Sequence, residues 1–376
     1  MKVLLIDTGD LEILPINREL SKLGHECKLI KKEYYPLNPF QDIWKKNDYE
    51  GLKVEEYDIV FTTTFLPELA KLCAAGNIYY FAWVLHMPCI ALYSQEVVLP
   101  TNRIFCLDMN LVQFFRQNGI ETIFYLPYAV DVVENEEVRD GVAVVTELDI
   151  AERHGVYQAL AGTKDATKGY LDGAAAAQAA VYPDLILQKL PSYIMEDILN
   201  NLETLDLPGN MATKEWIVRE YLYVDMLTAR ERLYLCSEIR GRKNVTFYMD
   251  SRISTTGVKQ EASPKGKQNG EAEVYSKAIM GIAMPKRSYD NCVFKETLKI
   301  MAGGAMALSP YTQEMSEFFA QQQNIVMFST DKEFKKLFKY YEDHPEECLE
   351  IGKNGQEIVK QYFNYQSRMV DMLSTI

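Results

Sequence analysis

The regular alternation of short apolar runs with segments of helical spacing is the strongest constraint on how this chain folds. Apolar runs at 2–7, 57–65 and 77–85 are separated by segments such as 11–24 and 67–76, whose apolar residues recur at helical intervals. Buried strands that alternate with helices are typical of a parallel sheet covered on both faces by helices. The pattern therefore predicts an α/β fold with a doubly wound parallel sheet.

Three glycines support the helix boundaries in this region. Gly24, Gly76 and Gly119 each follow a helical segment and precede an apolar run. Helices commonly end at a residue in the left-handed conformation, which glycine adopts without steric cost. We therefore expect each of the three to form a helix C-cap.

The second half of the chain repeats this pattern after an interruption. An acidic stretch at 134–140 is expected to be an exposed linker, and VAVVTELD (142–149) has the character of a new first strand. A long helical region at about 152–240 follows. Its alanine-rich stretch reflects high helix propensity. The remaining predicted elements are strands at 244–251, 279–285, 305–309 and 324–330, helices at 291–302 and 312–320, and two final helices.

One polar segment does not fit this alternation. Residues 255–273 are rich in Gly, Pro and charged side chains and lack an apolar period. We predict a mobile loop there, with a substrate lid as the alternative.

Length and composition limit the classes of protein that the chain can represent. With 376 residues it exceeds one comfortable core, so we expect two Rossmann-like domains at 1–133 and 134–355, the second with its helical insertion at about 152–240. A net charge of −13 argues against broad nucleic-acid binding. The seven cysteines are scattered, and no apolar run is long enough to span a bilayer. A cytoplasmic protein is the expectation.

Several catalytic motifs are missing from the sequence. No GxGxxG follows the first strand, which argues against a dinucleotide-dependent dehydrogenase. The sequence has no P-loop, GxSxG, HExxH, EF-hand or DxD spacing, and its four histidines lie far apart. We therefore expect no metal site.

Two candidate positions follow strands of the first domain. Thr8 and Gly9 belong to a DTGD turn after the first strand, where open α/β sheets bind ligands, although a plain tight turn explains them equally well. His86 ends a later strand and is a candidate general base. The alternative is a histidine satisfied by the local backbone.

Further candidates lie between strand and helix in the second domain. Lys286 and Arg287 beside a helix N-terminus combine charge with unpaired N–H groups, as a phosphate site requires, but a solvated basic turn has the same sequence. Glu296 and Lys299 are spaced as a helical ion pair, and the alternative is that both face the same cleft.

Longer stretches carry a family resemblance. YDIVFTTTFLPELAKLCAAGNIYYFAWVLHMPCIALYS, CLDMNLVQFFRQNGIETIFYLPYAVD, KGYLDGAAAAQAAVY, IMAGGAMALSPYTQE and the ending HPEECLEIGKNGQEIVKQYFNYQSRMVDML resemble spore-maturation-type (CgeB-like) bacterial glycosyltransferases. The resemblance extends over the whole chain and is weakest at 141–150 and 252–290.

The resemblance implies a GT-B architecture, with two Rossmann-like domains facing a cleft. A nucleotide-diphosphate sugar would bind mainly to the second domain and a hydroxyl acceptor to the first, without a metal or other cofactor. Basic side chains and a helix N-terminus would stabilise the leaving diphosphate. Residues 356–376 would form a C-terminal helix that packs back toward the first domain.

The resemblance also implies roles for individual residues. It places Thr146 near the diphosphate, and Gly303 and Gly304 at the adjacent helix-to-strand turn. The stretch SPYTQE then brings three side chains near the nucleoside, namely Tyr311, Thr312 and Glu314.

Two departures from the family pattern favour a second hypothesis. The family has a glycine-serine pair where this chain has VTE (145–147), and Glu296 and Lys299 stand where relatives carry an arginine and an acidic residue. The main hypothesis is a metal-independent glycosyltransferase. The alternatives are a non-catalytic GT-B-like binding protein and a nucleotide-sugar isomerase or epimerase.

Overall fold

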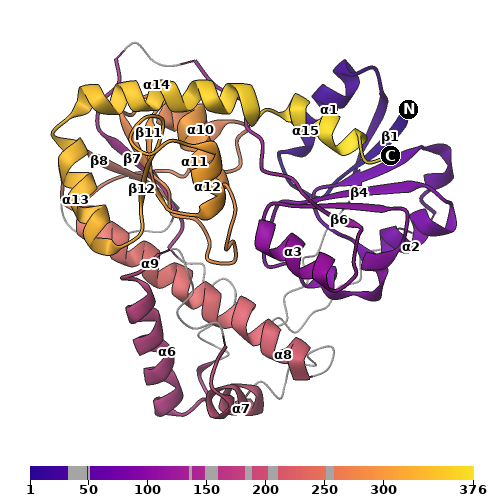
Figure 1. Cartoon of the computed structure of the whole chain (residues 1–376), viewed down its shortest axis with the longest axis horizontal. Coiled ribbons are helices and arrows are strands. Elements are labelled where there is room, and N and C mark those ends of the chain that lie inside the picture. Colours follow the sequence, from indigo (N-terminus) through magenta and orange to yellow (C-terminus); the bar gives the residue numbers. More distant parts are fainter. Residues whose placement is uncertain are drawn as a thin grey trace.

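The computed structural model describes residues 1–32, 49, 51–134, 138–148, 160–182, 189–201, 211–250 and 258–376. It has two parallel sheets of six strands each, with surrounding helices (Figure 1). This architecture confirms the predicted α/β fold with two doubly wound sheets. Within the described residues, none of the helices combines the length and apolar character that crossing a bilayer requires.

The first sheet has the strand order β2-β1-β3-β4-β5-β6, and every pairing is parallel. Strand β2 is added on one side of β1, and β3 to β6 are added on the other side. The carboxyl ends of β1 and β3 therefore form the topological switch point. Its elements are β1 (Lys2–Asp7), α1 (Ile13–Lys22), β2 (Glu26–Lys31), β3 (Ile59–Thr62), α2 (Pro67–Ala75), β4 (Tyr79–Val84), β5 (Asn102–Cys106), α3 (Met109–Gln117) and β6 (Ile123–Tyr125), with 3-10 turns η1 (Val54–Glu56), η2 (Ile90–Tyr93) and η3 (Gln95–Val98).

The second sheet has the order β12-β11-β10-β7-β8-β9, and its switch point lies between β7 and β10. Its strands are β7 (Val142–Val145), β8 (Val245–Tyr248), β9 (Lys259–Glu261), β10 (Met280–Ile282), β11 (Met306–Pro310) and β12 (Val326–Phe328). Its helices are α10 (Gly270–Tyr275), α11 (Lys295–Ala302), α12 (Gln313–Phe318), α13 (Asp331–Glu342), α14 (Pro345–Tyr362) and α15 (Tyr365–Leu373).

A helical insertion connects β7 to β8 and projects away from the second sheet (Figure 1). It has a hydrophobic cluster of its own, which includes Leu171, Ile198 and Leu227. A π-helical segment, η4, joins two of its α-helices without a break in the chain. The described elements are α6 (Asp165–Gln178), α7 (Ser192–Asn201), α8 (Met211–Val218), η4 (Arg219–Tyr223) and α9 (Val224–Ile239).

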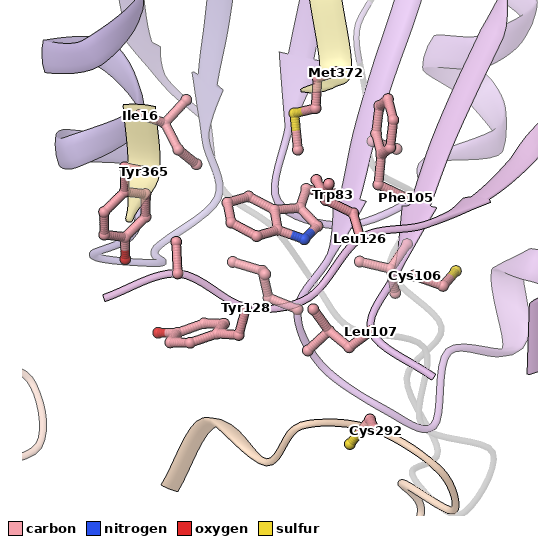
Figure 2. Packing of buried hydrophobic residues seen from close by; sticks show 14 of the residues in the cluster. Ile16, Trp83, Phe105, Cys106, Leu107, Leu126, Tyr128, Cys292, Tyr365 and Met372 are labelled. Atoms are coloured by element: carbon pink, nitrogen blue, oxygen red, sulfur yellow. The ribbon is translucent and has the colours of Figure 1, made fainter. Parts of the chain in front are cut away.

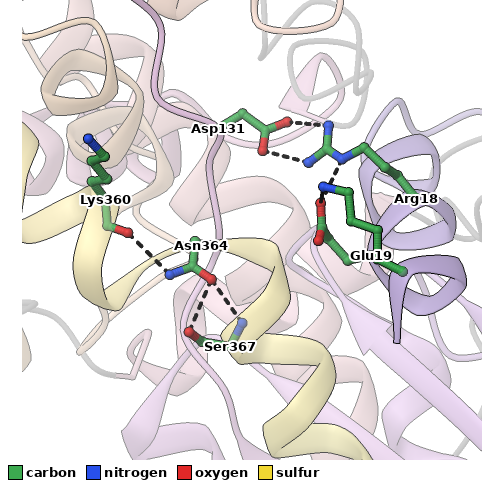
Figure 3. A network of polar contacts seen from close by, with 7 residues as sticks. Arg18, Glu19, Asp131, Lys360, Asn364 and Ser367 are labelled. Atoms are coloured by element: carbon green, nitrogen blue, oxygen red, sulfur yellow. Dashed lines mark hydrogen bonds and ion pairs between the residues drawn. The ribbon is translucent and has the colours of Figure 1, made fainter. Parts of the chain in front are cut away.

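The C-terminal helices connect the two domains. Three helices follow β12 rather than the predicted two, because the helical conformation is interrupted between α14 and α15, where Asn364 lies. Asn364 caps α15, because its Oδ1 accepts hydrogen bonds from the backbone N–H and the Oγ of Ser367 in the first turn of that helix (Figure 3). Helix α15 packs against α1 of the first domain. Nearby, Arg18 of α1 forms a two-pronged ion pair with Asp131.

The two domains also meet at the loop after β10. Asp108, at the end of β5, accepts hydrogen bonds from the backbone N–H groups of Asp290 at 2.5 Å and Asn291 at 3.0 Å. The same carboxylate caps α3 through the N–H of Leu111. Burial raises the pKa of Asp108, although these three N–H groups favour the ionised form.

The structure corrects several sequence predictions. The predicted loop at 255–273 contains β9 and α10, while 255–257 lie outside the described residues. Helix α11 begins at Lys295 rather than at 291. Residues 135–137 of the predicted linker, and residues 152–159, 183–188 and 202–210 of the predicted helical region, also lie outside the described residues.

All three predicted glycines lie at helix ends, but only two of them take the left-handed conformation. Gly24 and Gly119 have φ of 85° and 78°, as a left-handed cap requires. Helix α2 differs, since Gly76 keeps a negative φ and Asn77 takes the left-handed position. At the turn between α11 and β11, Gly304 has a φ of 77°. Gly303 is required for space, because a Cβ there would lie 2.5 Å from the carbonyl oxygen of Ala272.

Candidate active-site cleft

A cavity of about 420 Å³ lies between the carboxyl ends of the two sheets. Residues after β1, β4 and β6, with Tyr365, form one wall. Residues after β7 and β10, with Arg232, residues 265–272 and the start of α11, form the other. Both topological switch points therefore open into the same cavity, which is where open α/β sheets bind their ligands.

The first-domain wall carries a histidine–carboxylate pair. The Nε2 of His86 lies 2.5 Å from Oδ1 of Asp10, and the other oxygen of Asp10 accepts a hydrogen bond from Thr63 Oγ1. Thr63 lies 3.1 Å from Thr8 Oγ1. Burial alone would raise the pKa of Asp10, but the hydrogen bonds and the charge of His86 outweigh it and lower the pKa. Asp10 is therefore suited to orient the imidazole as an ionised partner.

The turn after β1 presents Asp10 to the cavity. Gly9 lines the cavity with a φ of 105°, and its N–H donates to Asp7 Oδ1 at 2.7 Å. Sequence reasoning selected Thr8 and Gly9 but missed Asp10. The signal was present, because Asp10 closes the same DTGD motif.

Two tyrosines of this wall pack against the core of the first domain. Tyr128 and Tyr365 both line the cavity, and each has its ring centroid 6.3 Å from that of Trp83 (Figure 2). All three side chains are buried. The Tyr128 hydroxyl donates a hydrogen bond to Glu12. This wall is therefore fixed by packing from β4, from the segment after β6 and from α15.

The second-domain wall is rich in cations. Two of them pair with carboxylates: Lys299 with Glu271 at 2.8 Å, and Lys265 with Glu147 at 3.1 Å. The full set comprises Arg232, Lys265, Lys267, Lys286, Lys295 and Lys299.

Arg232 comes from helix α9 of the insertion and is 4% exposed. It donates from Nε to the carbonyl oxygen of Met284 and from Nη1 to that of Glu147, both at 3.0 Å. These carbonyls follow β10 and β7, so Arg232 joins the two strands at the switch point. No sequence signal distinguished this arginine from the other charged residues of the helical region.

Lys286 and Lys295 have no carboxylate within ion-pair distance in the part of the chain that the structure describes. Burial lowers the pKa of Lys286, with nearby Asp225 acting in the opposite direction. Their ammonium groups and the guanidinium of Arg232 supply positive charge to a partly enclosed space. Such a space favours an anionic ligand.

Two polar atoms in this wall lack a hydrogen-bond partner among the described residues. They are Oγ1 of Thr146 and Oε2 of Glu296, and both are buried. Both residues line the cavity. Because a buried polar atom without a partner is costly, each is suited to bind a ligand group.

The cavity brings together six of the predicted site residues: Gly9, His86, Thr146, Lys286, Glu296 and Lys299. Glu296 and Lys299 both line this cavity, which agrees with the hypothesis that they face the same cleft. Lys299 pairs with Glu271, which lies on α10, and not with Glu296.

The other predicted residues lie outside this cavity. Arg287 is turned away, since its Nε lies 2.8 Å from Glu231 and its guanidinium covers the ring of Tyr182. Thr8 does not line the cavity. Its hydroxyl contacts that of Thr63, which in turn donates to Asp10. The remaining three have local contacts: Tyr311 with Ser316, Thr312 as the cap of α12, and Glu314 through its N–H with Asn291.

Among the described side chains, no group of three or more His, Cys, Asp or Glu residues could hold a metal ion.

Comparisons with known proteins agree with this architecture. Residues 240–374 match a family model described as "Glycosyl transferase-like". A sucrose-phosphate synthase from Thermosynechococcus elongatus superimposes with a TM-score of 0.50 at 11% identity, covering 100% of this chain and 98% of that one. HepE from Anabaena, solved in complex with UDP, has a TM-score of 0.50 at 12% identity, and both chains are covered fully. A comparison with curated proteins found no match.

The chain has a GT-B fold. The two parallel sheets and the cavity between their carboxyl ends are the GT-B arrangement. The family match covers β8 to α15, which includes most of the cation-bearing wall.

Proposed function

We propose that this protein is a glycosyltransferase that moves a sugar from a nucleoside-diphosphate sugar to a hydroxyl acceptor. The observation that carries the proposal is the asymmetry of the cleft. His86 and Asp10 lie at one switch point, and Arg232, Lys286 and Lys295 lie at the other. One wall is suited to remove a proton and the opposite wall to hold a leaving anion.

The second-domain wall is the proposed donor site. Lys286 and Lys295 would neutralise the diphosphate, Arg232 would donate to a phosphate oxygen, and the hydroxyl of Thr146 would complete this set. The UDP bound to HepE, which shares this fold, supports a nucleoside diphosphate as the ligand. Glu296 would accept hydrogen bonds from hydroxyl groups of the nucleoside-diphosphate sugar.

The first-domain wall is the proposed acceptor site, with His86 as the general base. If Nε2–H donates to Asp10, Nδ1 is the atom that takes the proton of the acceptor hydroxyl. The acceptor oxygen then forms a bond to the anomeric carbon of the sugar. The bond from that carbon to the diphosphate breaks, and the electron pair leaves with the diphosphate.

We propose that transfer needs no metal, because the cations of the second wall supply the charge that a metal would otherwise provide. We also propose a cytoplasmic location. All seven cysteines are free thiols, which suits a reducing compartment.

A second candidate function is binding of a nucleotide sugar without transfer. Glu296 and Glu147 favour it, because negative charge beside the cations of the donor wall would weaken their stabilisation of a leaving diphosphate, which binding alone does not require. A donor with two phosphates would be repelled unless Lys286, Lys295 and Arg232 together outweigh them. The two functions differ only in the chemical step.

Thermal melting with nucleoside diphosphates and nucleotide sugars tests binding. A ligand that binds only the folded state raises the melting temperature by mass action. We expect a shift with a nucleoside diphosphate. The absence of any shift at millimolar concentrations would contradict both functions. Release of free nucleoside diphosphate would then indicate transfer, and conversion of one nucleotide sugar into another would indicate an isomerase or epimerase.

A further inference from the structure

The backbone on both sides of His86 is held by the second domain. The Tyr289 hydroxyl donates to the carbonyl oxygen of Leu85 at 2.8 Å, and Ser288 Oγ donates to that of Met87 at 3.2 Å. Tyr289 is 4% exposed and lines the cavity. Ser288 and Tyr289 belong to the loop that also carries Lys286. The residues flanking the proposed base are therefore bonded to the loop that flanks the proposed donor site.

The segment that follows His86 is held by the insertion. The hydroxyl of Tyr221 donates to the carbonyl oxygen of Pro88 at 3.1 Å and accepts from the N–H of Ile90 at 3.2 Å. The side chain of Ile90 belongs to the hydrophobic cluster of the insertion, whose other members come from 160–229. The ring centroid of Tyr93 lies 4.3 Å from that of Trp216 in the insertion.

The same helix reaches the donor wall. Tyr221 lies in η4, which continues directly into α9. Arg232 follows eleven residues later, which is about 16 Å along a helix. Between these positions, Thr228 Oγ1 accepts from the N–H of Arg287 at 3.0 Å, and Glu231 pairs with the Arg287 guanidinium. Helix α9 is thus fixed to the loop after β10, and its extension η4 is fixed to the segment after His86.

From these contacts we infer that Tyr221 is a positioning residue for His86. Through η4 and α9 it couples the donor wall to the loop that carries the base, so that a bound diphosphate steadies His86. The inference rests on the proposed function, because it concerns the same cleft. Tyr221 does not line the cavity and touches neither substrate in this account. A π-helical segment at this position fits the frequent occurrence of such segments at functional sites.

A conservative substitution tests the inference. Tyr221→Phe removes the two hydrogen bonds and keeps the ring, and Tyr234→Phe is the matched control. Tyr234 lies on α9, the helix that continues from η4, but its hydroxyl bonds to Asp331, outside the cleft. We expect Tyr221→Phe to lower kcat about tenfold to a hundredfold with the KM of the donor unchanged, since misplaced reacting groups are costly. The control should match the wild type. Equal kcat values in all three proteins would overturn the inference.

Hydrogen exchange of the full-length wild-type protein gives a readout independent of catalysis and of the variant's folding. We expect UDP to slow amide exchange both at 284–291 and at 86–92. Tyr221→Phe should keep the first effect and lose the second. Protection at 284–291 without protection at 86–92 in the wild type would overturn the coupling alone. No protection anywhere, together with no shift in melting temperature, would remove the proposed function itself.

Discussion

The two walls of the cleft are built on the same kind of sheet edge but carry opposite chemistry. Each is the switch point of a six-stranded parallel sheet. The first presents His86 with an ionised partner, Asp10. The second presents Lys286, Lys295 and Arg232, together with the hydroxyl of Thr146. The fold determines where a ligand binds, and the few side chains after each strand determine what binds there.

The walls also differ in how their side chains are held. The aromatic side chains of the first wall pack on the core of the first domain, as Trp83 with Tyr128 and Tyr365 shows, and its backbone beside His86 is bonded to the second domain. The second depends on an insertion, because Arg232 comes from α9 rather than from the loop after β7. An insertion is thus part of the binding wall and not only an addition to the surface.

The largest expected effect concerns the first wall. His86→Ala should lower the transfer rate by about 10²–10⁴-fold, because the acceptor loses its general base. His86 is exposed, so the melting temperature and the affinity for a nucleoside diphosphate should stay close to the wild-type values. Steady-state kinetics and calorimetry check both parts. A variant with full activity would move the base elsewhere on this wall.

The second wall should respond in binding rather than in rate alone. Lys286→Ala should weaken nucleoside-diphosphate binding by about 1.5–3 kcal/mol through loss of a charge-assisted contact. The affinity of Lys286→Ala for the free nucleoside should differ little from that of the wild type. Lys332→Ala, an exposed change on α13, serves as the control. Equal calorimetric affinities for wild type and Lys286→Ala would remove Lys286 from the donor site.

The contact of Asp108 between the two domains should matter for stability. Asp108→Ala leaves three backbone N–H groups without their acceptor and should lower the free energy of unfolding by about 2 kcal/mol. The raised pKa of Asp108 gives the sign of the pH dependence. Its contribution is fully present below about pH 4, its ordinary pKa, and declines as the pH rises through the folded-state pKa. Urea unfolding at several pH values measures this, and a difference that grows with pH would contradict it.

The smallest effect is expected at Asp10. Asp10→Asn should cost about 1 kcal/mol near neutral pH, because the hydrogen bonds from His86 and Thr63 lose their charged acceptor. The pKa of Asp10 is lowered, so the sign is opposite to that at Asp108. The stability difference should be present above about pH 4 and disappear as the pH falls through the folded-state pKa. A difference that persists in acid would show that Asp10 acts by shape rather than charge.

The sequence was sufficient for the sheets, because buried parallel strands are continuous apolar runs. It was insufficient for β9, an edge strand of Lys, Gln and Glu in which Lys259 and Glu261 are exposed, because this strand carries no apolar signal. Lys286 and Arg287 are neighbours in sequence, yet only the first faces the cavity, because Arg287 is drawn to Glu231. Arg232 could not be found at all, since its role depends on how the insertion packs against both switch points.

A crystal structure of the protein with bound UDP would test the central claim most directly. We expect the diphosphate to lie against Lys286, Lys295, Arg232 and the hydroxyl of Thr146, on the side of the cavity opposite His86. Density for the diphosphate outside this cavity, or at the first-domain wall beside Asp10, would contradict the assignment of the two walls.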